Sequence, residues 1–161
     1  METAPSETTP SGTTSSGTTS SETWPKRVTL MTKLAASENG GVRLADGTIV
    51  TSGGDLTLYQ AMVLSISTPT ADSLCEKGTF DALSDVPTTI DACPASLSGT
   101  WEQRAYLSAA TTHGSDQSYV IGLGILVRNP DHTAMYRLRV VGDSYDSGGV
   151  STATFDYEPV P

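Results

Sequence analysis

Histidine and methionine are the residue types in this sequence that could ligate a metal ion or the iron of a haem. A neutral imidazole nitrogen or a thioether sulfur can serve as an axial ligand. His113 and His132 stand in polar, turn-like stretches, where a solvated side chain is the alternative. Met62 has the spacing of a core residue, whereas Met135 falls on the face opposite Tyr136. His113, His132 and Met135 are therefore the candidate haem ligands, and the two histidines are the candidate metal ligands.

The two cysteines, Cys75 and Cys93, are separated by 17 residues. A disulfide between them would close a loop with little regular structure of its own. In the chain-entropy model such a bond stabilises the fold by about 3 kcal/mol. A zinc site would need a second pair of Cys or His residues, and none accompanies them. We expect the Cys75–Cys93 disulfide, with two reduced core thiols as the alternative.

The residues typical of catalysis are poorly represented. There is no Gly-x-Ser-x-Gly motif and no glycine-rich phosphate loop that opens a helix. Asp143 and Asp146 could hold a calcium ion, but the further carboxylates of a calcium loop are missing, so a solvated acidic turn is expected. We therefore predict that the protein is not an enzyme.

Composition limits the partners. The 161 residues suit a single domain, and the net charge of −9 argues against nucleic-acid binding through a basic surface. No apolar run approaches the roughly 20 residues that span a bilayer, and polar residues follow Met1 directly, unlike a signal peptide. The composition leaves the oligomeric state open.

Residues 1–23 are almost entirely Thr, Ser, Gly, Pro, Ala and Glu. Such a segment buries too little apolar surface to offset the entropy lost on ordering, so we expect a disordered tether followed by one β domain over residues 24–161. In exported bacterial proteins a tether of this kind often follows a lipid-modified cysteine, so a membrane would be contacted only through such an anchor. An unstructured terminus of a cytosolic protein is the alternative.

The strongest structural signal lies between Ser118 and Tyr157. One face of an extended segment is apolar at every second position, at Tyr119, Ile121, Leu123, Ile125 and Val127. Gly122 and Gly124 fall on the other face, where a neighbouring layer could approach closely. Turn residues at 129–132 and 143–149 separate two further alternating stretches. We predict three successive antiparallel strands.

The remaining stretches also indicate a mainly β chain. A strand is expected over residues 26–32, and a hairpin over 42–51. Residues 55–66 predict one long strand or two strands joined by a bulge, although the middle could be written as helical turns. Residues 68–98 are irregular, with a possible helical turn at 71–76 and a loop from Phe80 to Val86 pinned onto the core. A further strand is expected within 101–107. The fold class is all-β, mainly antiparallel, with little helix.

Several short motifs occur together within residues 42–158. They are Gly54-Asp55-Leu56, Phe80-Asp81-Ala82-Leu83 with Val86-Pro87, Tyr119-Val120-Ile121, Met135-Tyr136-Arg137-Leu138-Arg139-Val140, Asp143-Ser144-Tyr145-Asp146 and Ala153-Thr154-Phe155-Asp156-Tyr157. In combination they resemble the HmuY-like family of bacterial haem-binding lipoproteins. One departure is Gly54, which stands where the family's Trp-Asp-Leu motif has Trp.

The resemblance implies an antiparallel β protein, tethered to the bacterial outer membrane surface or secreted, that captures haem from solution or from a haem-carrying protein. It implies that His113, six residues before Tyr119, is an axial ligand, with His132 or a methionine as a possible second. Near Thr79 and Phe80, where a second ligand would be sought upstream, this sequence has no histidine. The alternative is a cofactor-free surface β domain for adhesion or for protein–protein interaction in the cell envelope.

Overall fold

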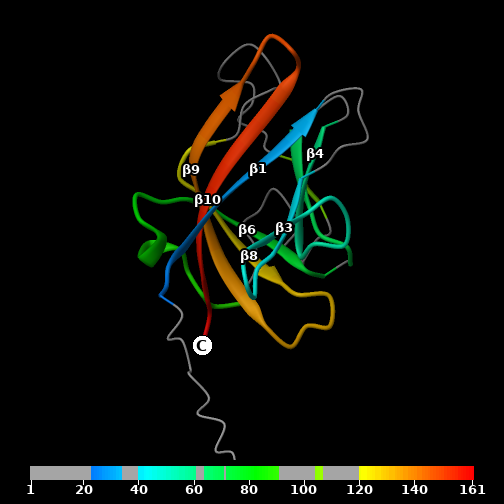
Figure 1. Ribbon diagram of the computed structural model, residues 1–161. Coiled ribbons are helices and arrows are strands. Elements are labelled where there is room, and N and C mark those ends of the chain that lie inside the picture. Colours follow the sequence, from blue (N-terminus) through cyan, green and yellow to red (C-terminus); the bar gives the residue numbers. More distant parts are fainter. Residues whose placement is uncertain (1–22, 34–39, 61–63, 71, 91–103, 107–119) are drawn as a thin grey trace, which may run out of the picture.

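Two antiparallel β-sheets form the architecture of this computed structural model, which describes residues 23–33, 40–60, 64–70, 72–90, 104–106 and 120–161 (Figure 1). The helical structure within these ranges is one 3-10 turn, η1 (Leu83–Asp85). The predicted all-β fold is thereby confirmed. Of the predicted tether, Thr23 alone falls within the described residues. None of the helical structure described here is long and apolar enough to cross a membrane.

The first sheet has the order β1-β10-β9-β8-β6. Its strands are β1 (Lys26–Lys33), β6 (Leu74–Thr79), β8 (Leu123–Arg128), β9 (Met135–Tyr145) and β10 (Val150–Pro159). The last three strands pair with one another in succession, which confirms the predicted C-terminal meander. The strand predicted at residues 26–32 is β1, and its alternate residues Val28 and Leu30 are buried as expected.

Two boundaries of the meander differ from the prediction. The first strand begins at Leu123, because Gly122 takes a left-handed φ of 90° and forms a turn. Ile121 consequently leaves the apolar face and is 52% exposed. At the other end, β9 continues to Tyr145, and the turn into β10 starts only at Asp146, whose Oδ1 accepts hydrogen bonds from the backbone of Gly148 and Val150.

The second sheet has the order β3-β2-β4-β5-β7. Its strands are β2 (Gly41–Arg43), β3 (Thr48–Val50), β4 (Leu56–Gln60), β5 (Leu64–Ser67) and β7 (Arg104–Tyr106). The hairpin predicted over residues 42–51 is β2–β3, and Gly47 supplies the positive φ of its turn. The long or bulged strand predicted over 55–66 is wrong, because β4 and β5 run antiparallel with Gln60 opposite Leu64.

The inner faces of both sheets contribute to one hydrophobic core. From the first sheet come Val28, Leu30, Leu123, Ile125, Val127, Tyr136, Leu138, Val140, Ala153, Phe155 and Tyr157, and the second contributes Val42, Leu56, Leu58 and Ile66. The period of two along β9 and β10 places these side chains inward, as predicted. Trp24 packs edge-on against Tyr157 with 5.7 Å between the ring centroids, so the core extends to the start of β1.

The segment that follows β6 covers the outer face of the first sheet. The predicted helical turn at residues 71–76 is wrong, since Leu74–Thr79 forms the edge strand β6 beside β8. The loop from Phe80 to Val86 is pinned as predicted, and Val86 is 1% exposed. This loop lies over β8 at Gly124, where an added Cβ would lie 2.6 Å from the nearest carbon of the Phe80 ring. Gly124 therefore permits the close approach that the sequence pattern predicted.

Candidate functional site

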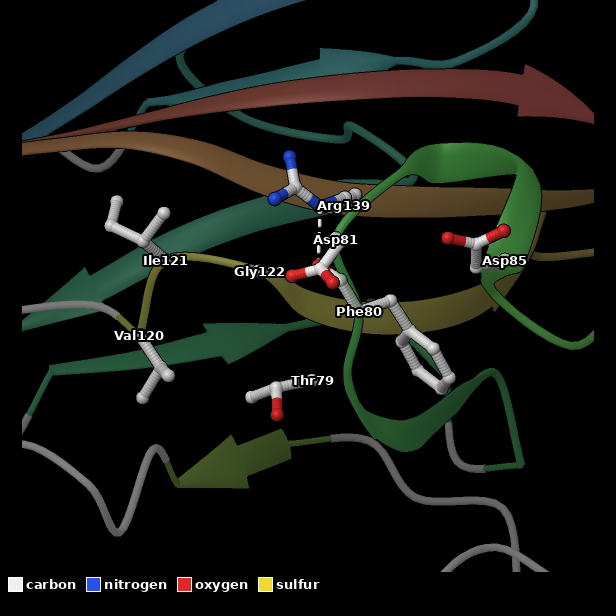
Figure 2. Close-up of a pocket in the computed structure, with 8 residues that line it drawn as sticks. All are labelled: Thr79, Phe80, Asp81, Asp85, Val120, Ile121, Gly122 and Arg139. Atoms are coloured by element: carbon white, nitrogen blue, oxygen red, sulfur yellow. Dashed lines mark hydrogen bonds between the residues drawn. The ribbon is translucent and has the colours of Figure 1, made fainter.

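A hollow of about 670 Å³ lies where the segment after β6 meets the segment before β8 (Figure 2). The residues that line it are Thr79, Phe80, Asp81, Asp85, Val120, Ile121, Gly122 and Arg139. Its volume lies within the range of about 300–1,000 Å³ that is typical of small-molecule sites. Its walls combine the apolar side chains of Phe80, Val120 and Ile121 with charged groups.

Backbone hydrogen bonds fix the two walls relative to each other. The N–H of Phe80 donates to the carbonyl of Gly122 over 2.8 Å, and the N–H of Gly122 donates to the carbonyl of Val140 over 2.8 Å. A Cβ at Gly122 would lie 2.9 Å from the Phe80 carbonyl oxygen, so glycine permits this approach as well as the positive φ. Segments some 40 residues apart in sequence are thereby held side by side.

Arg139 on β9 supplies the cation of the hollow. Its Nε donates to the carbonyl of Phe80 over 2.7 Å, and the two terminal nitrogens lie on the side of Ile121 in Figure 2. Arg137, two residues earlier on the same face of the sheet, is fully engaged. Its guanidinium binds Glu158 and the carbonyls of Ser84 and Val86, which clamps the loop onto the sheet.

The carboxylates at the hollow make few contacts. Asp81 and Asp85 both line it, and among the described residues neither forms an ion pair with Arg139. Ser84 Oγ donates to Asp85 Oδ1 over a long 3.4 Å. The hollow therefore presents cationic and anionic groups that remain available to a ligand.

The predicted ligand residues that the structure describes lie outside this hollow. His132 is exposed in the β8–β9 turn with a φ of 59°, and its Nε2 lies 3.1 Å from Ser73 Oγ. Met135 opens β9 and packs with Cys75 and Leu126 on the outer face of the sheet. His113 lies outside the described residues.

Cys75 is buried in β6 and is disulfide-bonded. Cys93 is the other cysteine of the chain, but it lies outside the described residues, so the pairing of the two stays a prediction. The disulfide of Cys75 lies on an edge strand whose last residue, Thr79, lines the hollow.

Acidic side chains elsewhere have structural partners. Burial is the main cause that raises the pKa of Asp55, whose Oδ2 accepts the N–H of Leu44 over 2.7 Å. Hydrogen bonds from Thr133 lower the pKa of Asp131. Asp146 binds the backbone of its own turn, as expected for an acidic turn residue. In the described ranges, no three or more His, Cys, Asp or Glu residues are grouped to hold a metal ion.

The hollow fits a haem only in part. Phe80, Val120 and Ile121 offer apolar contact for a porphyrin, and Arg139 offers a cation for its carboxylates. Its described lining contains no His, Met, Cys or Tyr, so an iron ligand must come from elsewhere. His113 precedes Val120 by seven residues, a span of at most about 25 Å for an extended chain. This limit is compatible with an iron ligand from His113, which lies outside the described residues.

A second hollow, of about 530 Å³, opens between β1 and β3. Its lining includes Met31 and Ile49, which are 60% and 54% exposed, together with Val50 and Val150. Since β1 and β3 are edge strands of their sheets, this apolar groove lies beside open strand edges. Strand edges and exposed apolar side chains are features of protein-binding surfaces.

The importance of Arg139 was missed from the sequence. A signal was present, because Arg137 and Arg139 alternate with core residues of β9 and must share the outer face.

Comparison with known proteins does not assign this chain to a family: no family model, curated protein or solved structure matches it significantly.

Proposed function

We propose that this protein is an exported or surface-tethered β domain that captures haem in the hollow beside Arg139. The carrying observation is that the hollow joins the two segments singled out by the HmuY-like resemblance. One contains Phe80 and Asp81, and the other contains Val120 and Ile121, shortly after His113. The antiparallel β fold is the one that the resemblance implies.

In this proposal the chain's own groups have distinct roles. Phe80, Val120 and Ile121 provide apolar contact with the flat face of the ligand and exclude water from it. His113 supplies the axial imidazole, since the described lining offers none. The Nε2 of His132 contacts Ser73 Oγ, so Nδ1 is the nitrogen through which His132 could bind a ligand while keeping that contact. When bound, the iron would add the coordinate bond that makes the complex tight.

The proposal is tested by titrating the purified protein with haemin while the Soret band is recorded. His113→Ala should weaken binding markedly and change the band, because the iron loses a strong ligand. His132→Ala is the matched control and should matter only if this histidine is the second ligand. A wild-type protein without a saturable spectral change in either redox state would contradict haem capture.

The second candidate is a cofactor-free surface domain for adhesion or for protein–protein interaction in the cell envelope. The apolar groove between β1 and β3 favours it, since Met31 and Ile49 expose large apolar side chains beside strand edges. Ile49→Glu should abolish retention of the protein on cells that carry its partner, and His113→Ala should leave retention intact. Equal retention of Ile49→Glu and wild type would contradict a role for this groove.

A further inference from the structure

The outer face of the first sheet carries arginines and acids in register across three strands. Asp156 of β10 lies opposite Arg27 of β1 on one side and opposite Arg139 of β9 on the other. Glu158 of β10 lies opposite Arg137. Since directly opposite side chains are close enough to pair, each of these arginines has an acid within reach of its register position.

The actual pairing leaves Arg139 without a carboxylate. Asp156 accepts two hydrogen bonds from Arg27, over 2.6 and 2.8 Å, which use both of its oxygens. Glu158 binds Arg137. Among the described residues, Arg139 donates to the Phe80 carbonyl alone, and this bond uses only the Nε–H. The N–H groups of both terminal nitrogens remain for a ligand.

The position of this guanidinium suits a ligand rather than solvent alone. Arg139 is half-buried and lines the hollow, and its Nε hydrogen bond holds the planar group in one orientation. The two terminal nitrogens form a fork that matches the two oxygens of a carboxylate. A fixed and partly desolvated fork loses little entropy when it binds such a group.

We infer that the hollow binds an organic carboxylate, with the terminal nitrogens of Arg139 donating to its two oxygens. The inference rests on the proposed function only in taking this hollow as the binding site. Two sources share the chemistry: the propionate of a porphyrin and a small free organic acid. Asp81 and Asp85 line the same hollow, so a ligand with one or two carboxylates is favoured over a ligand of higher negative charge. Apolar contact with Phe80 and Ile121 favours a carboxylate on an apolar skeleton.

The first arm of the test follows arginine Nε–Hε signals by NMR while succinate is added to the full chain at constant ionic strength. The Arg139 signal should shift and saturate, whereas the signal of Arg43, which is exposed on the second sheet, should not. Arg139→Gln should weaken succinate binding about 10- to 100-fold, the loss expected for a charge-assisted contact. Arg43→Gln should bind as wild type does. Equal responses of Arg43 and Arg139 would overturn the inference.

The second arm compares haemin with haemin dimethyl ester, which lacks free carboxylates. If the ligand is a porphyrin, the ester should bind the wild type more weakly than haemin does, and Arg139→Gln should reduce this difference. Saturable binding of succinate without any binding of haemin would refute haem capture and support the carboxylate site. Haemin binding that is indifferent to esterification and to Arg139→Gln, without a succinate response, would refute the carboxylate site and leave haem capture standing.

Discussion

Gly124→Ala tests the contact that holds the loop of the hollow against the sheet. A methyl group at this position would lie 2.6 and 2.8 Å from two carbons of the Phe80 ring and 2.9 Å from Cγ2 of Val86. Gly124 is not among the glycines with a positive φ, so the backbone itself accepts alanine. The effect of the substitution is therefore attributable to overpacking.

The expected loss of stability follows from these distances. Overpacking by one carbon in a tight site costs about 1–3 kcal/mol. Replacing a glycine in a strand returns about 0.5–1 kcal/mol through reduced chain entropy. Contacts of 2.6–2.9 Å place the overpacking cost in the upper part of its range, about 2–3 kcal/mol. The net effect should therefore be a destabilisation of about 1–2.5 kcal/mol, or a fall of roughly 3–10 °C in Tm for a domain of this size. Urea denaturation and calorimetry of the purified protein measure both quantities.

A double-mutant cycle identifies the contact responsible. Two of the three close atoms belong to Phe80, so in a Phe80→Ala background the loss caused by Gly124→Ala should be no more than about half as large. Because Phe80 lines the hollow, the single variant Gly124→Ala should also weaken ligand binding. Unchanged stability of Gly124→Ala, or an equal loss in the Phe80→Ala background, would refute the packing described for the loop.

Three other measurements test the core, a titrating side chain and the cross-link. Phe155→Ala should cost about 3–5 kcal/mol in urea denaturation, because the ring is fully buried, whereas exposed Met31→Ala should change stability by less than about 0.5 kcal/mol. Burial raises the folded-state pKa of Asp55, so folding favours the protonated carboxyl. The stability of the wild type should therefore fall as the pH rises from the ordinary aspartate pKa through the raised folded-state pKa. Asp55→Asn should lose this dependence, and an identical pH profile of stability for both proteins would contradict the prediction. Cys75 and Cys93 should resist thiol labelling in denatured, unreduced protein, and recovery of two free thiols would exclude the predicted bond.

The strands of the C-terminal meander were predictable because the side-chain period directly reports which face is buried. The hairpin of β4 and β5 was not. The residues between Tyr59 and Ser65 contain no Gly, Pro, Asn or Asp, so no local turn signal interrupts the apolar pattern. The start of β8 was predicted too early, although a turn residue is present there. Gly122 can occupy a strand as well as a turn, so the sequence did not show that the strand begins only at Leu123. Gly122 combines its positive φ with a backbone hydrogen bond to Phe80, which lies far away in the sequence.

The candidate site was still less accessible to sequence reasoning. The hollow lies between two segments that are joined by the hydrogen bond between Phe80 and Gly122. These residues are 42 positions apart, and a contact over such a separation leaves no periodic signal in the sequence. The arginines of β9 could be assigned to the outer face, but their partners could not. Which acid pairs with which arginine depends on the register of three strands and on the choice of Asp156 between two neighbours.

The pairing of Asp156 leads to a last prediction. Arg27 does not line the hollow, yet its replacement should change how tightly the hollow binds a carboxylate. Arg27 donates to both oxygens of Asp156, and we expect this pairing to hold the carboxylate away from Arg139, its neighbour on the adjacent strand. In Arg27→Ala, Asp156 should turn to Arg139 and compete with an external carboxylate. Because exposed ion pairs are weak, succinate binding should weaken only roughly two- to fivefold. Arg27→Lys keeps a cation beside Asp156 and should have a smaller effect. If Arg27→Ala binds succinate as tightly as the wild type, competition for Asp156 does not determine whether Arg139 is available.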